Sequence, residues 1–210
     1  TTEIYTLSLH DALPILIELD PNSISAHFNL AVCQEKLGRW NEAAANFQRV
    51  LSKDEKRLDA RLGLGICLLH SQNAEKALEC FEVVLKKMPA DETALFGKAV
   101  SLELLTRFDE AMALYRQIIA ANPNAEEVMS NLVQIGMKRS DVGLVAETSE
   151  QLLTLRPFSQ TALEGLAWCA FAKEDYEAAS RYCAKLVELT PEHLERRYNL
   201  GVAYQKLEKL

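Results

Sequence analysis

The sequence has no hydrophobic run long enough to cross a membrane, because no stretch approaches the roughly 20 consecutive apolar residues that a membrane-spanning helix needs. It also lacks a basic excess. Its 23 Lys and Arg residues stand against 30 Asp and Glu residues, for a formal net charge of −7. Nucleic-acid-binding proteins carry a basic stripe that pairs with phosphates. We therefore predict no membrane span in this segment and no nucleic-acid partner.

Residues that carry catalysis or bind metals are few and scattered. There is no HExxH or CxxC pair and no Gly-rich phosphate loop after a strand. His27, His70 and His193 share no helix face. No nucleophile, base and orienting group occur together. We predict no metal site, no cofactor and no catalytic activity in this segment.

The five cysteines are an odd number, which does not suit a complete set of disulfides. Cys33, Cys67 and Cys169 lie 34 residues, or a multiple of 34, apart, which indicates that packing places them. A metal or redox site is the alternative, but small buried thiols are the usual role of free cysteine. Free thiols favour a reducing compartment such as the cytoplasm.

The sequence has only six prolines, and five of them form a ladder with a step of 34 residues: Pro21, Pro89, Pro123, Pro157 and Pro191. Glu55 occupies the missing position. Proline cannot continue a helix, so the ladder marks the end of a repeated unit. We number each unit in slots 1–34, with the proline in slot 32. The complete copies are residues 24–57, 58–91, 92–125, 126–159 and 160–193. Residues 16–23 end an earlier copy, and residues 194–210 form the first helix of a later one.

Each copy predicts two amphipathic helices joined by a tight turn. In residues 58–91, Leu64 and Leu68 mark the apolar face of the first helix, and Phe81 and Val84 that of the second. Slots 8 and 20 hold small residues in most copies, which lets helices approach closely. Gly65 in slot 8 is therefore expected to meet Ala77 in slot 20.

This pattern resembles the tetratricopeptide repeat family over residues 16–210. The segments LGRWNEAAANF (37–47) and TRFDEAMALY (106–115) are close to the family's turn and second helix. The family's tryptophan slot near the start of the first helix is not kept. The resemblance implies an all-α fold, an α-solenoid of antiparallel helix pairs that forms a right-handed superhelix.

Residues 1–15, TTEIYTLSLHDALPI, fit no repeat and contain the one proline off the ladder, Pro14. They resemble the translation of a common sequencing-library adapter. The alternative is a native amphipathic lead-in. We predict a non-native leader over residues 1–15, and we expect the remaining sequence to be a segment cut at both ends.

The family resemblance implies a concave groove lined by the first helices at slots 2, 5, 9, 12 and 13. We predict that the apolar residues there bind a peptide: Phe28, Val32, Leu62, Ile66, Leu69, Phe96, Val100, Trp168 and Phe171. The alternative is that slots 5 and 9 are partly buried against the neighbouring first helix. The Lys and Arg set with which some members clamp a C-terminal carboxylate is absent.

Other family members, such as the O-linked N-acetylglucosamine transferases, carry a ladder of inward asparagines at slot 6. Here slot 6 holds Asn29, Gly63, Gly97, Asn131, Gly165 and Asn199. We include Asn131 among the predicted peptide-binding residues. A solvated or locally bonded amide is the alternative.

The fourth copy, residues 126–159, is irregular. It has Val133 and Val145 in the two small slots, and Gly136 in slot 11. Paired valines are expected to separate the helices, or to shift them so that Val133 fills the space at Gly136.

These observations predict a protein–protein interaction scaffold that binds an extended or helical apolar peptide segment in its groove. The expected partner is a protein or peptide, and the oligomeric state is left open. The alternative is a substrate-recruiting segment of a larger enzyme, such as a glycosyltransferase, whose catalytic domain lies elsewhere.

Overall fold

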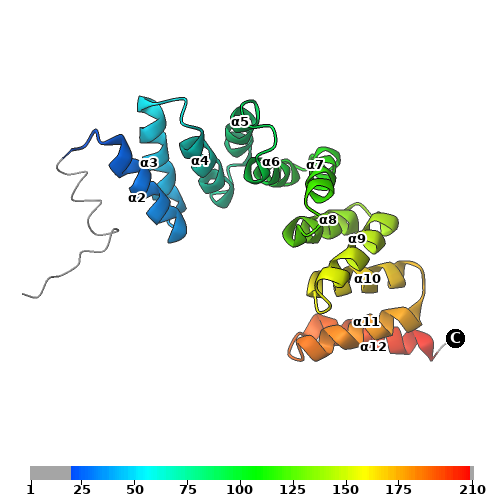
Figure 1. Cartoon of the computed structure of the whole chain (residues 1–210). Coiled ribbons are helices and arrows are strands. Elements are labelled where there is room, and N and C mark those ends of the chain that lie inside the picture. Colours follow the sequence, from blue (N-terminus) through cyan, green and yellow to red (C-terminus); the bar gives the residue numbers. More distant parts are fainter. Residues whose placement is uncertain (1–19, 209–210) are drawn as a thin grey trace, which may run out of the picture. The chain divides into compact units, whose positions relative to one another are not determined.

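The computed structural model describes residues 20–208. Within that range it contains eleven helices and no strand (Figure 1): α2 (Ile24–Lys36), α3 (Trp40–Lys53), α4 (Leu58–His70), α5 (Ala74–Leu85), α6 (Glu92–Leu104), α7 (Phe108–Ala121), α8 (Glu126–Lys138), α9 (Val142–Leu155), α10 (Gln160–Ala172), α11 (Tyr176–Leu189) and α12 (Leu194–Leu207). The leader predicted at residues 1–15 lies outside the described residues. Each of the five complete repeat ranges contains one helix pair.

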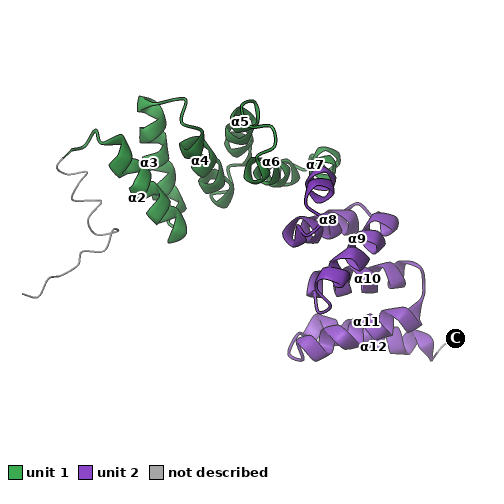
Figure 2. Cartoon of the chain, in the orientation of Figure 1, with its two compact units in different colours: residues 1–114 green, residues 115–210 purple. Residues whose placement is uncertain are grey.

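The chain divides into two compact units, residues 1–114 and 115–210, and the division falls within α7 (Figure 2). In the first unit, consecutive helices from α2 through α6 pack on one another, and α4 also contacts α2 and α6. In the second, α8 to α12 do the same, and α8 also contacts α10. Each unit is thus a stack of helix hairpins, and the all-α solenoid expected from the sequence is confirmed.

The turn inside each hairpin has the same backbone form in all five pairs. Slot 15 lies in the left-handed region, with φ of 72° at Gly38 and 57–59° in the other four copies, which hold Gln72, Thr106, Ser140 and Glu174. The next N–H reaches back to a carbonyl five residues earlier, as from Asn73 to Leu68 at 2.9 Å. This is the Schellman pattern, which satisfies carbonyls left free at a helix end. The turn is therefore defined by backbone hydrogen bonds rather than by glycine alone.

The turn without a proline is held by a side chain. Asp54 precedes Glu55, and its carboxylate accepts a hydrogen bond from the N–H of Lys56 at 3.1 Å. Asp20 and Asn122 occupy the same slot before prolines and accept the equivalent bond from Asn22 and Asn124. Asp and Asn often stabilise turns in this way. The helix break at position 55 therefore does not need proline.

Phe81 is a fully buried aromatic side chain of the first unit. Its ring is 0% exposed and lies between two glycines. A methyl group on Gly97 would lie 2.6 Å from Phe81 Cε1, and one on Gly65 would lie 2.8 Å from the same atom. The side of Gly65 on which a methyl group would stand therefore faces Phe81 and Cys80, and its expected contact with Ala77 stays a prediction. The aromatic ring needs more room than an alanine methyl and takes the space that both glycines leave.

The same relation connects slot 24 of one repeat to slot 6 of the next. A methyl group on Gly63 would lie 2.6 Å from Phe47 Cε2, as on Gly97 for Phe81. Where slot 24 is Tyr115, the following slot 6 is Asn131, whose amide donates to the tyrosine hydroxyl at 3.3 Å. The gaps at Gly63 and Gly97 in the asparagine ladder thus have a steric cause, because a phenylalanine ring fills the volume that an asparagine side chain needs.

The two valines of the fourth repeat are fully buried. Val145 lies over Gly136, where a methyl group would be 2.7 Å from Val145 Cγ2. Val133 lies against Gly165 instead, with 2.8 Å between a methyl there and Val133 Cγ1. The expectation that Val133 fills the space at Gly136 was therefore wrong. Two glycines in different helices each accommodate part of the added valine volume.

Candidate functional site

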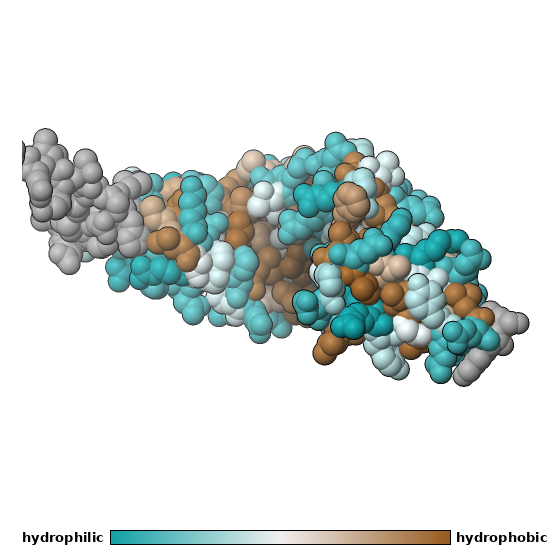
Figure 3. Space-filling view, turned by 90° about the horizontal axis from the view of Figure 1, so that it is seen from below, coloured by the Kyte–Doolittle hydropathy of each residue, from teal (hydrophilic) through white to brown (hydrophobic). Residues whose placement is uncertain are grey.

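The predicted groove residues of the first unit form a partly exposed layer over its core. Hydrophobic side chains are interspersed with hydrophilic ones on the face seen in Figure 3. Five of the predicted residues are half-buried and pack against one core cluster that includes Phe47 and Phe81: Phe28, Val32, Leu62, Ile66 and Leu69. Phe96 and Val100 on α6 are also half-buried. Part of each side chain therefore supports the core, and part remains available to a ligand.

Phe28 is further covered by a charged neighbour. The guanidinium carbon of Arg57 lies 4.1 Å from the centre of the Phe28 ring, a cation–π geometry. Asp59 holds Arg57 in place with two hydrogen bonds, at 3.1 and 2.8 Å. The bond from Arg57 keeps the pKa of the Asp59 carboxyl below its usual value. Phe28 is therefore less open to a ligand than its slot suggested.

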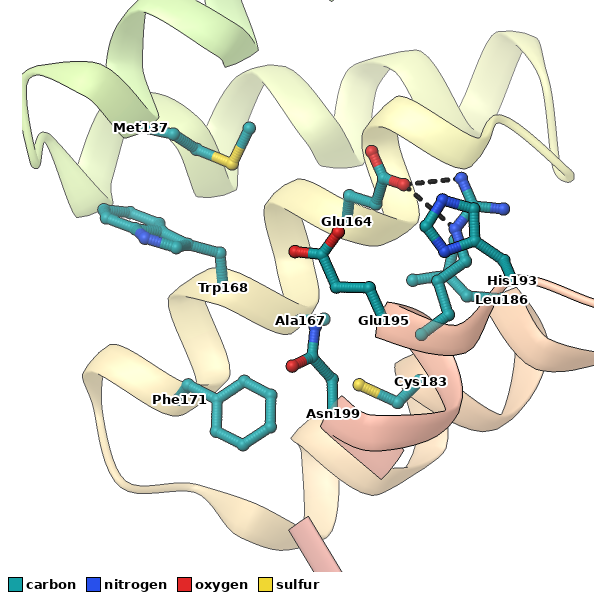
Figure 4. Close-up of a pocket in the computed structure, with 11 residues that line it drawn as sticks. Met137, Glu164, Ala167, Trp168, Phe171, Cys183, Leu186, His193, Glu195 and Asn199 are labelled. Atoms are coloured by element: carbon teal, nitrogen blue, oxygen red, sulfur yellow. Dashed lines mark hydrogen bonds and ion pairs between the residues drawn. The ribbon is translucent and has the colours of Figure 1, made fainter. Parts of the chain in front are cut away.

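In the second unit, Trp168 and Phe171 line one pocket of about 430 Å³, which we call the Trp168 pocket (Figure 4). Its lining residues come from α8, α10, α11 and α12 and from the turn before α12: Met137, Glu164, Ala167, Trp168, Phe171, Cys183, Leu186, His193, Glu195, Arg196 and Asn199. Ligand pockets in proteins are typically of about this volume and combine apolar walls with a few polar groups. The structure thus brings two of the predicted residues into one concave site.

The polar wall of the Trp168 pocket is held by Arg196, whose side chain is only 10% exposed. Its Nε and Nη2 donate to one oxygen of Glu164, at 3.1 and 2.5 Å. Nη2 also donates to Gln160 Oε1 at 3.0 Å, and Nη1 donates to the Thr190 hydroxyl. These bonds join α10 to α12 and fix the orientation of Glu164.

Asn131 does not line the Trp168 pocket, and its amide donates to the Tyr115 hydroxyl. This is the locally bonded alternative that the sequence left open. A role for Asn131 in binding a peptide backbone stays a prediction, and it requires the amide to exchange one partner for another.

Sequence reasoning missed the polar half of the Trp168 pocket. Glu195 is in slot 2, Glu164 in slot 5 and Asn199 in slot 6, while Met137 and Phe171 share slot 12. These are slots already assigned to the groove or to the asparagine ladder. Only apolar side chains were selected from the groove slots, so the glutamates were passed over. Applying the same slots to polar residues would have found them.

The cysteine thiols have the surroundings of core residues. Cys67, Cys80, Cys169 and Cys183 are buried. Burial raises the pKa of all four thiols, to about 12 for Cys67. The thiolate is the reactive form of cysteine. These groups are therefore protonated at neutral pH and poorly suited to nucleophilic chemistry.

We expect Cys67 to resist iodoacetamide in the folded protein at neutral pH and to react after unfolding in urea. Because the Cys67 pKa is higher in the folded chain than in the unfolded chain, the thiol ionises more readily when the chain unfolds. The free energy of unfolding should therefore decrease as the pH rises above the thiol pKa of the unfolded chain. Mass spectrometry of the labelled peptides measures the reaction, with half-buried Cys33 as the internal comparison. Rapid labelling of Cys67 in the folded state would contradict this assignment.

Residues 20–208 contain neither a membrane-spanning helix nor a metal-binding cluster. No helix in that part of the chain has the length and hydrophobicity to span a membrane. The same residues contain no group of three or more His, Cys, Asp or Glu side chains arranged to hold a metal ion.

Stacked helix hairpins of 34 residues define this chain as a helical-repeat protein. Family models described as tetratricopeptide repeat match residues 16–45, 36–98, 73–126 and 146–193. The chain belongs to the tetratricopeptide repeat family, as the resemblance in its sequence predicted.

Curated relatives match parts of the chain. The chain is 26% identical over 194 residues to the peroxisomal targeting signal receptor of Eremothecium gossypii, covering 77% of this chain and 33% of the receptor. It is 36% identical over 96 residues to human superkiller complex protein 3, covering 39% of this chain and 6% of that protein. The chain thus spans a third or less of these relatives. The matches identify it as a protein-interaction repeat scaffold.

Solved structures share the fold at low sequence identity. YrrB, described as a TPR protein with an unusual peptide-binding site, has a TM-score of 0.69 and 19% identity, and the match covers 90% of this chain and 97% of YrrB. A tetratricopeptide repeat protein from Parabacteroides merdae has a TM-score of 0.75 and 15% identity, and the match covers 89% of this chain and 74% of that chain. At these identities the likeness establishes the fold alone.

Proposed function

We propose that this chain binds an apolar or amphipathic peptide segment, extended or helical, of a partner protein. The Trp168 pocket anchors one side chain of the peptide in the second unit. In the first unit, the exposed parts of Leu62, Ile66 and Leu69 offer an apolar surface to a peptide. A bound segment is recognised by its apolar residues, as in other grooves that hold peptides or helices.

The observation that carries this proposal is the Trp168 pocket itself. Trp168 and Phe171 are only half-buried although each is a large aromatic. A few residues contribute most of the binding free energy of many interfaces, and tryptophan is enriched among them. Their surfaces line a cavity of about 430 Å³, large enough for a side chain of a peptide.

The relatives support the class of ligand without naming it. One is a peroxisomal targeting signal receptor, and one structural neighbour is described as having a peptide-binding site. A peptide-binding site is thus described for one protein that shares this fold. Which peptide this chain binds has to be found by selection.

A second candidate function is substrate recruitment within a larger enzyme. It rests on a match to a probable UDP-N-acetylglucosamine–peptide N-acetylglucosaminyltransferase, SPINDLY, of Solanum lycopersicum, 29% identical over 86 residues and covering 9% of that protein. The same surfaces would then bind a protein substrate. A catalytic domain in the same reading frame of the gene would favour this candidate, and a frame made of repeats alone would count against it.

The binding proposal is tested by selecting a random-peptide phage library on the immobilised chain and measuring the affinity of the selected peptides. Leu62→Asp and Trp168→Asp, combined in one variant, are expected to weaken binding roughly tenfold or more, because the loss of a central aromatic anchor typically has an effect of this size. Thermal unfolding followed by circular dichroism reports whether the variant still folds.

Leu37→Asp is the matched control for Leu62→Asp, since Leu37 is 59% exposed and lies in a turn. This variant should bind like the parent chain. A double variant that no longer folds would mean that Leu62 and Trp168 are core residues, and the site as proposed would be wrong. A folded double variant with full affinity would equally overturn it.

A further inference from the structure

The charged side chains of the Trp168 pocket differ in whether they can still bind a ligand. Among the described residues that line the pocket, Arg196 is the only Arg or Lys. All three of its nitrogens already donate hydrogen bonds, and its side chain is almost fully buried. Arg196 is therefore a fixed part of the wall and has little capacity left for an anionic ligand.

The carboxylates of the pocket remain available. The bonds from Arg196 to Glu164 both end on Oε1, and Oε2 accepts no hydrogen bond from any of the described residues. The Glu164 side chain is 42% exposed. Glu195 is exposed and forms no ion pair within residues 20–208. Among the Arg, Lys, Asp and Glu residues of the lining, one positive charge thus stands against two negative ones, and the carboxylate oxygens without a hydrogen bond belong to Glu164 and Glu195.

The aromatic and acidic groups converge from different helices. In Figure 4 the carboxylate of Glu195 and the amide of Asn199 extend from α12 toward the side of the pocket where α10 carries Trp168 and Phe171. A ligand group that enters between them meets ring faces on one side and oxygen acceptors on the other. A purely apolar group can pack against the rings but cannot donate hydrogen bonds to the oxygen acceptors.

We infer that the Trp168 pocket takes a basic side chain, lysine or arginine, of the bound peptide. This inference rests on the peptide-binding function proposed above and specifies its ligand. The methylene stem packs along Trp168, Phe171 and Met137, as the stems of Lys and Arg do on apolar surfaces. The cationic head pairs with Glu195 and the free oxygen of Glu164 and is attracted to the ring faces. A peptide carboxylate would instead face two like charges.

The test begins with phage-displayed random peptides selected on the parent chain. The peptide that binds best is then synthesised, together with variants in which each basic residue in turn is replaced by methionine. We expect the selected peptides to share a Lys or Arg position. Its replacement by methionine should weaken binding roughly 5- to 10-fold, because a charge-assisted hydrogen bond is lost. Glu195→Gln should weaken binding of the basic peptide to a similar degree and leave the affinity for the methionine peptide unchanged.

Glu192→Gln removes the same charge at an exposed residue outside the pocket and is the matched control. Equal losses from Glu192→Gln and Glu195→Gln would mean general attraction to an acidic chain and would overturn the inference. Selected peptides without a common basic residue, or with a required C-terminal carboxylate, would overturn it while leaving the peptide-binding function in place. If the parent chain selects no peptide at all, the proposed function fails as well.

Discussion

Replacing Phe81 by alanine is expected to lower the free energy of unfolding by about 3–5 kcal/mol, the usual cost of truncating a fully buried phenylalanine. The ring contacts glycines on two successive first helices, Gly65 on α4 and Gly97 on α6. These backbones leave a large cavity when the ring is removed, because glycine has no side chain that can move into it. Urea denaturation followed by circular dichroism measures the change.

Phe158→Ala is the control, because it removes the same atoms from a side chain that is 76% exposed. Surface substitutions usually change stability by less than about 0.5 kcal/mol. A loss near 1 kcal/mol for Phe81→Ala would mean that the neighbouring helices close over the cavity, and the described packing would then overstate the role of the ring. Equal losses for the two variants would contradict the assignment of Phe81 to the core.

The repeat was predictable because its strongest signals are local. A proline breaks a helix wherever it stands, and small residues at fixed slots permit close helix contacts. The ladder from Pro21 to Pro191 therefore gave the length and phase of the unit without tertiary information. The prediction was less complete for the space between the two helices of one repeat. Gly65 was paired with the small Ala77, although the larger ring of Phe81 on the same helix fills the volume beside it.

The candidate site was predictable in part for the same reason. Trp168 and Phe171 were found because large aromatics at groove slots are conspicuous on a helix face. The roles of Glu164 and Arg196 depend on a contact between α10 and α12. The two residues are 32 positions apart in the chain. No periodicity within one helix reports such a contact. Surface glutamates are also common, so only the pocket distinguishes Glu164 and Glu195 from solvated side chains.

Gly97→Ala and Gly201→Ala are expected to change stability in opposite directions. Alanine favours a helix interior over glycine by roughly 0.5–1 kcal/mol. At Gly201 an added methyl group meets nothing within 4 Å, so that gain should appear undiminished. At Gly97 the methyl lies 2.6 Å from Phe81 Cε1, and overpacking of a core costs roughly 1–3 kcal/mol. We expect Gly97→Ala to lower the free energy of unfolding by about 1–2 kcal/mol.

The opposite signs separate steric conflict from helix propensity, which is the same for both substitutions. Urea denaturation of the two single variants measures each effect. Phe81→Leu then tests the cause, because a shorter side chain leaves room for the methyl group. In that background the cost of Gly97→Ala should largely disappear, which appears as a coupling energy between the two sites. Stabilisation by Gly97→Ala in the parent chain, or the same cost with and without the Phe81 ring, would mean that the ring is not what requires glycine at slot 6.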